Sequence, residues 1–574
     1  MRGAPDFHNM AGFLTETALY RYATPKCYTA DEVPDTFGER HGNLPAKTPS
    51  TNYTNPWLGG CWPLRQPVEY MLTASRATLD LAAKLKEDFL FNIWRMGTRQ
   101  IARGEKAEGG PYAYVIDLAA QHDPTRTVEL LRTFRTGGVE IRRADAPFSA
   151  GGKQYPAGTY VIGPQPFRPY VIDLMEPKTF PERRLYPGGP PDPPYDMTGY
   201  ELRFQMGVTA DRVTEAFPLP SAVVDEVPPA PGGVEGTGSA GFALSPNLNL
   251  GVKAINRLLK AGAKVAVAAT DDHSMIVTGI ARDVVQQHGK ELGVMFRALD
   301  ALPANANLRP LRAPRIGLYK SWLGNMDEGW TRWLLEQYEF TFKNLSNDDI
   351  RGDLSQFDVI LFADETEEEI LNGHAPGTMP DQYVGGIGVD GAANLRKFVE
   401  RGGWVVAWDH AADFAIMALG LPLRNTVKAT RPSEFFIPGS LIKLEVEPAH
   451  PLAAGVAMKP DNHAIAMFAD SQAFTIVPPA AEGKQRAARD VDAYVRYPRA
   501  ADGLLVSGWQ LGASRFIAGR VAAARVPVGK GSAVVIGFRP HWRGQPHNTF
   551  KLLFNPLFES TSSSPSSSPG SNTR

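Results

Sequence analysis

Few residues of this chain have the types and spacing that metal chemistry needs. His288 and Glu291, in QQHGKELG, have the His-x-x-Glu spacing of a zinc ligand pair. We favour an exposed helix end here, because Gly289 should break the helix that would present both ligands on one face. The segment TDDHS, 271–273 with its neighbours, follows a predicted strand. Its Asp271, Asp272 and His273 could bind a hard cation, but a polar loop is the more common outcome.

Two glycine-rich segments have features of phosphate-binding loops. Gly386, Gly388 and Gly391 match GxGxxG before a predicted helix. A dinucleotide site also needs a strand directly before the first glycine, and TMPDQYV is a poor strand, so we predict a loop. The segment Gly529–Ser532 (GKGS) lacks P-loop spacing and leads into a strand. It is predicted to be a hairpin turn.

Asp409 and His410 lie where WVVAWDHAADFAI passes from a predicted strand into a predicted helix. Flavodoxin-like domains of the amidotransferase type carry a nucleophilic cysteine at this turn. Because no cysteine follows Cys61, the thiol mechanism of a glutaminase is excluded. The two residues could form a polar pair in a cleft, or a structural loop, which we favour.

Two further segments hold candidate binding or catalytic residues. RPHWRGQPHNTF, 539–550, contains two arginines, two histidines and Trp542, and could bind an anion or form a packed loop. If the C-terminal region binds a ligand, we expect a pocket lined by Asp409, His410 and Arg543. AGFLTE, 11–16, is predicted to be an apolar strand that ends on Glu16. A carboxylate there needs a partner or a role, and it could be a general base or a helix-start residue.

Alternating strands and helices must position these residues. A long helix is predicted over Gln66–Ile101, followed by α/β units in which a glycine ends each helix before the next strand. Asp123 should cap a helix, and GTYVIG and PYVIDLM are predicted to be strands. From Pro314 onward the pattern predicts a doubly wound parallel sheet, with Asp327 capping its first helix and a β-rich insertion over 435–530. The fold class is therefore α/β and multidomain.

Composition limits the function classes. The 574 residues include 60 Lys+Arg and 61 Asp+Glu, so the net charge of −1 argues against nucleic-acid binding. The length predicts about three or four domains. No apolar run reaches the ~20 residues of a membrane helix. The N-terminal sequence MRGAPDFHNMAGFLTE does not predict a signal peptide. Two cysteines, Cys27 and Cys61, allow at most one disulfide, and the sequence leaves their pairing open.

Three segments carry a family resemblance: residues 7–28, YTNPWLGGCWPLRQPVEYMLTASRATLDLAAK and GFRPHWRGQPHNTFKLLFN. They resemble large bacterial zinc carboxypeptidases of the carboxypeptidase A-like family, which are secreted and end in a domain like class I glutamine amidotransferases. The resemblance covers nearly all of 1–557. It implies a remnant of the peptidase domain over 1–105, α/β units over 106–185 and 241–312, and a linker region over 186–240. The flavodoxin-like, amidotransferase-like domain covers 313–557 and a disordered tail covers 558–574.

The resemblance also implies a peptide substrate, an extracellular or periplasmic location and a role for Glu16. Glu16 matches the catalytic base that activates zinc-bound water. The family's zinc ligands precede that glutamate, and this chain has only His8 before it. We therefore expect no zinc site and no peptidase activity from this chain, which reads as the C-terminal part of a metallocarboxypeptidase. The alternative is a non-catalytic accessory module that binds a ligand, such as a peptide or glycan.

Overall fold

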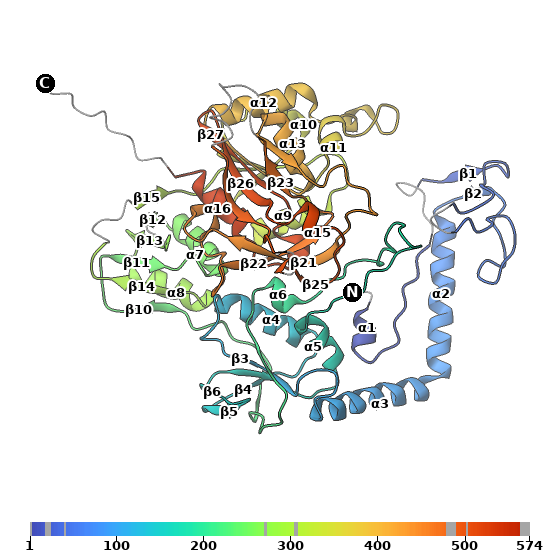
Figure 1. Ribbon diagram of the computed structural model, residues 1–574, viewed down its shortest axis with the longest axis horizontal. Coiled ribbons are helices and arrows are strands. Elements are labelled where there is room, and N and C mark those ends of the chain that lie inside the picture. The colour runs from blue at the N-terminus through green and yellow to red at the C-terminus, as the bar shows by residue number, and fades with distance from the viewer. Residues whose placement is uncertain are drawn as a thin grey trace. The chain divides into compact units, whose positions relative to one another are not determined.

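The computed structural model describes residues 3–17, 24–38, 42–268, 272–302, 308–477, 490–500 and 503–562 (Figure 1). The chain divides into two compact units. The first is Met1–Lys106 with Pro164–Tyr170, and the second is Ala107–Gly163 with Val171–Arg574. Helices and several sheets alternate along the chain, which confirms the predicted α/β multidomain class.

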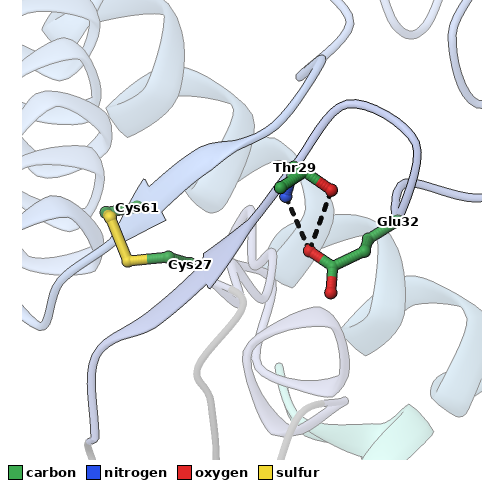
Figure 2. Close-up of a disulfide and its surroundings, with 4 residues drawn as sticks. All are labelled: Cys27, Thr29, Glu32 and Cys61. Atoms are coloured by element: carbon green, nitrogen blue, oxygen red, sulfur yellow. Dashed lines mark hydrogen bonds between the residues drawn. A yellow bond between two sulfur atoms is a disulfide. The ribbon is translucent and has the colours of Figure 1, made fainter.

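The first unit holds a disulfide between two short strands. Cys27 lies opposite Cys61 in an antiparallel pair, and the two residues are disulfide-bonded (Figure 2). Beside them, Glu32 accepts hydrogen bonds from the N–H and the hydroxyl of Thr29, at 2.7 and 3.1 Å. These bonds close the turn after the first strand. The elements here are α1 (Ala4–Phe7), β1 (Lys26–Tyr28) and β2 (Gly60–Trp62).

The long helix predicted over 66–101 is two helices, α2 (Arg65–Lys84) and α3 (Lys86–Glu105). The chain turns at Leu85, whose φ of −107° and ψ of 22° are not helical (Figure 1). Both helices leave large apolar side chains exposed, including Leu72, Leu79, Leu81, Leu90, Phe91 and Trp94. Few buried contacts within this unit therefore support them.

The strand predicted over AGFLTE is wrong. Residues 11–17 form neither helix nor strand, and Glu16 is exposed. The β1–β2 pair is the one sheet among the described residues of this unit, and it does not include this segment. Without a partner strand, an apolar pattern alone does not make a strand.

The second unit begins with an antiparallel sheet in the order β8-β3-β7-β4-β9. The predicted helix α4 (Pro124–Thr136) is confirmed, and Asp123 caps it by accepting the N–H of Thr125 at 2.9 Å. The strands are β3 (Ala113–Ile116), β4 (Arg142–Arg143), β7 (Tyr160–Ile162), β8 (Asp211–Val213) and β9 (Ala222–Val223), with a separate hairpin of β5 (Phe148–Ala150) and β6 (Lys153–Tyr155).

A six-stranded sheet follows, in the order β10-β14-β11-β13-β12-β15. Only β10 and β14 are parallel neighbours among its described pairs. Its helices are α7 (Asn249–Lys260) and α8 (Arg282–Leu292). Its strands are β10 (Gly233–Glu235), β11 (Gly241–Leu244), β12 (Lys264–Ala268), β13 (Met275–Thr278), β14 (Met295–Leu299) and β15 (Leu308–Leu311).

The largest sheet has a parallel part in the order β17-β16-β18-β19-β27. This confirms the parallel α/β arrangement predicted after residue 314. The strands are β16 (Ile316–Tyr319), β17 (Phe342–Leu345), β18 (Val359–Phe362), β19 (Trp404–Trp408) and β27 (Gly531–Ile536).

Helices cover both faces of this parallel part. Leu361 and Trp408 belong to one hydrophobic core, whereas Ile360 and Ala407 belong to another, because successive strand residues face opposite sides. The first core includes residues of α9 (Met326–Gln337) and α16 (Lys551–Glu559). The second includes residues of α10 (Asn347–Arg351), α11 (Glu367–Asn372), α12 (Gly388–Glu400) and α13 (His410–Leu419).

The segment 435–530 is rich in strands, as predicted, and β26 joins it to the parallel part by pairing antiparallel with β27. Val528 lies opposite Gly531, so GKGS is the hairpin turn that the sequence predicts. Its strands are β21 (Pro438–Val446), β22 (His463–Ala469), β23 (Phe474–Ile476), β24 (Asp492–Arg496), β25 (Leu505–Ser507) and β26 (Val521–Val528), and β20 (Leu423–Asn425), which precedes the segment, pairs with β23.

Three local predictions are wrong. PYVIDLM is helical, within α5 (Arg168–Met175). Asn325, not Asp327, caps α9, because its side chain accepts the N–H groups of Asp327 and Glu328. Gly289 does not break α8. A Cβ there would lie 2.8 Å from the backbone of Gly233, so glycine permits close packing of the helix on β10.

Candidate ligand-binding site

Asp409 occupies the turn between β19 and α13, with φ 53° and ψ −128°. Residues other than glycine rarely adopt this conformation, and such strain is concentrated at functional sites. Hydrolases with a nucleophile elbow use the same kind of turn to expose a nucleophilic side chain. Here the side chain of Asp409 is fully buried. The turn is therefore present, but a buried carboxyl group occupies it.

Four elements bring charged residues to the carboxyl ends of neighbouring parallel strands. Asp364 follows β18, Asp409 follows β19, Arg539 follows β27, and Asp327 lies in the first turn of the helix that follows β16. Open α/β sheets bind ligands at this edge. We call these four residues and His410 the elbow cluster.

Arg539 is the central cation of the elbow cluster. Its Nε donates to Asp364 Oδ2 at 2.9 Å, and its Nη2 also donates to that oxygen. The same Nε lies 3.3 Å from Asp327 Oδ2 and 3.6 Å from Asp409 Oδ2. Burial alone would lower the pKa of Arg539, but the three carboxyl groups raise it overall. The guanidinium therefore stays charged in this buried position.

His410 is the second cation. Its backbone N–H and its Nδ1 both donate to Asp364 Oδ1, at 3.0 and 2.8 Å, and Nδ1 lies 3.3 Å from Asp409 Oδ1. The hydrogen bond to Asp364 raises the pKa of His410 to about 9, against the effect of burial and with help from the charge of Asp409. The side chain is therefore an imidazolium at neutral pH.

The three carboxyl groups differ in protonation. Burial raises the pKa of Asp409 well above its ordinary value, although Ser471 donates to its Oδ2 at 3.0 Å. Burial also raises the pKa of Asp327 to about 6. Burial acts in the same direction on Asp364, but His410 and Arg539 lower its pKa to about 2. Asp364 is therefore the carboxylate that pairs with both cations, whereas Asp409 and Asp327 hold a proton more readily than an ordinary Asp.

This geometry does not support acyl transfer. In elbow enzymes, the N–H of the residue after the nucleophile helps to stabilise the oxyanion. Here that N–H belongs to His410 and already donates to Asp364. Since Asp409 is buried as well, both the nucleophile position and the oxyanion donor are occupied by internal contacts.

His410 is the member of the elbow cluster that lines a pocket of about 540 Å³. Its side chain is 35% exposed. Lys428 lies 3.1 Å from Glu367 Oε2 and 3.7 Å from Asp413 Oδ2, and burial raises the pKa of Asp413. The described lining contains the carboxyl groups of Glu367, Glu368, Asp413 and Asp470, and the amides of Asn372, Asn425 and Gln472.

Asp364, Asp409 and His410 offer three possible metal-ligand atoms within 4.8 Å of one another. No other group of this kind occurs in the described part of the chain. A cation would have to displace the proton that His410 shares with Asp364, next to the positive charge of Arg539. We therefore assign these residues to ion pairing. The sequence predicts no metal site in this chain, and this cluster was not among its candidates.

Of the residues Asp409, His410 and Arg543, which the sequence predicts to line one pocket, His410 lines it, whereas Asp409 is buried and Arg543 lies elsewhere. Arg543 instead forms an ion pair. Its Nη1 and Nη2 donate to Asp196 at 3.2 and 3.1 Å, and its guanidinium lies 4.2 Å from the centre of the Trp542 ring. Arg539, four residues earlier, is the arginine that lies beside Asp409, although it does not line the pocket. Arg543 lies in a kinked turn with a positive φ of 50°.

The remaining candidates lie apart from the elbow cluster. His288 Nδ1 is 3.8 Å from Glu291 Oε2 on α8, but Arg257 also binds that oxygen, at 3.1 Å. Gly388 and Gly391 lie within α12, so of the three glycines of the predicted loop only Gly386 lies outside a helix, and a 3₁₀ turn, not a strand, precedes them. Asp271 lies outside the described residues. Asp272 and His273 line a different cleft. Glu16 is exposed in the first unit.

Sequence reasoning missed Asp327, Asp364 and Arg539. Each follows a strand of the parallel sheet, as Asp409 does. The signal that finds them is their common position, because the carboxyl ends of parallel strands meet at one edge. Their separation along the chain, over more than two hundred residues, hides that signal until the strand order is known.

No family model matches the chain, and no curated protein matches its sequence. Solved structures match in part. PurLQS from Thermotoga maritima is 14% identical, over 43% of this chain and 99% of that one, with a TM-score of 0.27. A cytoplasmic protein from Salmonella typhimurium is 12% identical, over 42% and 97%, at 0.25. β-Galactosidase from Bacillus circulans is 10% identical, over 48% and 33%, at 0.24. These TM-scores carry no argument about function.

None of the helices in the described ranges is long and apolar enough to span a membrane.

Proposed function

We propose that this chain is a binding protein whose C-terminal sheet binds a small ligand with an ammonium group, of the amino-acid or short-peptide type. The observation that carries the proposal is the strained turn at Asp409, which supports the ion-paired elbow cluster and brings the imidazolium of His410 to a polar pocket. Strained backbone residues are concentrated at ligand-binding sites as well as at catalytic sites.

The charges that line the pocket favour this ligand class. Four carboxyl groups face two cations, His410 and Lys428, so the described lining has an excess of negative charge. An ammonium group would pair with the carboxylates, and a ligand carboxylate would pair with the imidazolium. The volume of about 540 Å³ lies within the range of small-molecule sites.

The proposal extends to the location of the protein. Disulfides persist in oxidising compartments and are rare in the cytosol. The bond between Cys27 and Cys61 therefore supports an extracellular or periplasmic accessory module, in line with the resemblance to secreted carboxypeptidases. Zinc peptidase activity stays a prediction for the large carboxypeptidases that this chain resembles. For this chain, the exposed position of Glu16 gives it no support.

Calorimetric titration with L-alanyl-L-alanine and its N-acetylated form tests the proposal. We expect the free dipeptide to bind and the acetylated form to bind at least about 10-fold more weakly, because acetylation removes the ammonium charge. The variants His410→Gln and Asp413→Asn should weaken binding by a similar factor, and Arg543→Gln should not. Equal affinity for both probes, or no binding of either, would refute the proposal.

A further inference from the structure

The second unit contains a cleft of about 1090 Å³ that shares no lining residue with the pocket of His410. It is formed by α6 (Leu202–Gln205), the strand β14, the turn before β22 and the loop that holds Asp272 and His273. Its volume exceeds that of most small-molecule pockets. The cleft is therefore large enough for an elongated ligand.

The charges that line this cleft are mostly positive. The lining contains three cations, Arg203, Arg297 and Lys459. Asp272 is the one carboxylate among the described lining residues. Arg297 and Lys459 are exposed, whereas Arg203 is half-buried. Three histidines also line the cleft: His122, His273 and His463. The positive charge of this lining disfavours a hard cation at Asp272 and His273.

Two buried polar atoms in the lining lack a hydrogen-bond partner. Arg203 Nη2 donates to the carbonyl of Ala210 at 3.0 Å, but the buried Nε of Arg203 has no hydrogen-bond partner. His273 is nine-tenths buried, and its Nε2 contacts the carbonyl of Ala449 at 2.8 Å. Its Nδ1 has no partner. A buried polar atom without a partner is costly, so these atoms indicate a missing ligand group.

A buried ion pair lies behind the cleft wall. Asp123 Oδ2 lies 3.0 Å from Arg126 Nε, and burial lowers the pKa of the neighbouring Lys551 well below its ordinary value. Burial, followed by the charges of Arg126 and Lys551, lowers the pKa of His122 to about 4. The ring of His122, which lines the cleft, is therefore neutral at pH 7, and the positive charge of the lining comes from Arg203, Arg297 and Lys459.

We propose that this cleft binds an organic anion with two or more negative groups, either phosphates or carboxylates, on an extended body. Arg297 and Lys459 would pair with the negative groups. Phe204, Met295 and Ile465, which also line the cleft, would contact the apolar part of the ligand. The mixed lining favours such a molecule over a simple inorganic ion.

Calorimetric titrations of the full chain with pyrophosphate and with citrate, at low salt, test this inference. We expect at least one probe to bind, and the probe that binds more tightly identifies the negative group as phosphate or carboxylate. The double variant Arg297→Gln/Lys459→Gln should weaken that binding at least about 10-fold. The control Arg424→Gln/Lys530→Gln removes two exposed charges outside the cleft and should change affinity less than about 2-fold.

The variant Asp272→Asn should increase affinity for the probe, a result that misfolding cannot produce. It removes the described negative charge of the cleft and should tighten binding of the same probe by about 2- to 5-fold. Absence of binding by both probes would overturn the inference. So would an equal loss of affinity in the cleft and control double variants, or weaker binding by Asp272→Asn.

Discussion

At the scale of single residues, Arg539 balances the carboxyl groups of the elbow cluster. Its replacement by methionine, Arg539→Met, leaves Asp364, Asp327 and Asp409 in a buried site with His410 as the remaining cation of the elbow cluster. Breaking a buried ion pair costs about 3–5 kcal/mol, so we expect a loss of that size in the free energy of unfolding measured in urea.

Arg543→Met is the matched control. Arg543 and its partner Asp196 are 37% and 35% exposed, and exposed ion pairs contribute about 0–1 kcal/mol. Arg539→Lys should lose less than Arg539→Met because the charge is kept. Similar losses from Arg539→Met and Arg543→Met would contradict the central role of Arg539.

His410 should make stability depend on alkaline pH. Its pKa of about 9 in the folded chain lies above the ordinary value of 6.5, so the protonated ring stabilises the fold fully below pH 6.5. This contribution is lost as the pH rises through 9. Because the side chain is 35% exposed, solvent screening reduces the contribution to about 1–2 kcal/mol.

Urea unfolding of the native chain and of His410→Gln, at pH 6 and at pH 9.5, measures this effect. The native chain should exceed the variant in stability at pH 6, and the difference should shrink at pH 9.5. Asp327, with a pKa of about 6, also titrates near the lower pH, so each pH value is judged by the difference between the native chain and His410→Gln. A difference between the two proteins that is the same at both pH values would contradict the protonated state of His410.

At the scale of elements, the turn between β19 and α13 forces a strained conformation on Asp409. Glycine tolerates a positive φ, whereas alanine does not. Asp409→Gly should therefore be more stable than Asp409→Ala by about 1–2 kcal/mol, although both variants lose the carboxyl group. In a regular helix or strand, alanine is the more stable residue by about 0.5–1 kcal/mol. That usual order, measured by urea unfolding at position 409, would contradict a strained turn.

The elements themselves were largely predictable from sequence. Strand–helix alternation with buried apolar runs predicts the parallel sheet, and a capping Asp with a following Pro predicts α4. PYVIDLM failed because its apolar run fits a buried helix as well as a strand. The break between α2 and α3 at Leu85 could not be predicted, because no Pro or Gly lies there.

The candidate site was predictable only where its residues are adjacent. Asp409 and His410 are found because they follow a strand directly. Arg539 and Arg543 cannot be told apart from sequence, because the kinked turn that separates them depends on the packing of the whole loop. Asp364 and Asp327 look like ordinary loop and helix-start residues until the order of β16, β18, β19 and β27 brings them together.

At the scale of the whole molecule, the chain combines a disulfide-bonded first unit with a second unit that holds both proposed binding sites. We expect no release of C-terminal residues from peptides by the purified chain, with or without added zinc. Chromatographic detection of the products and metal analysis after dialysis measure this. Stoichiometric zinc together with hydrolysis would contradict the proposal of a binding protein.

The turn at Asp409 holds the ion-paired elbow cluster, with His410 as an imidazolium beside the pocket. The most direct test is an NMR titration of the chain with labelled histidine rings, in which the His410 signal is assigned by its loss in His410→Gln. We predict a midpoint at about pH 9, lowered in Asp364→Asn because the main cause of the raised pKa is removed. A midpoint at or below 6.5, or one that Asp364→Asn leaves unchanged, would contradict the account.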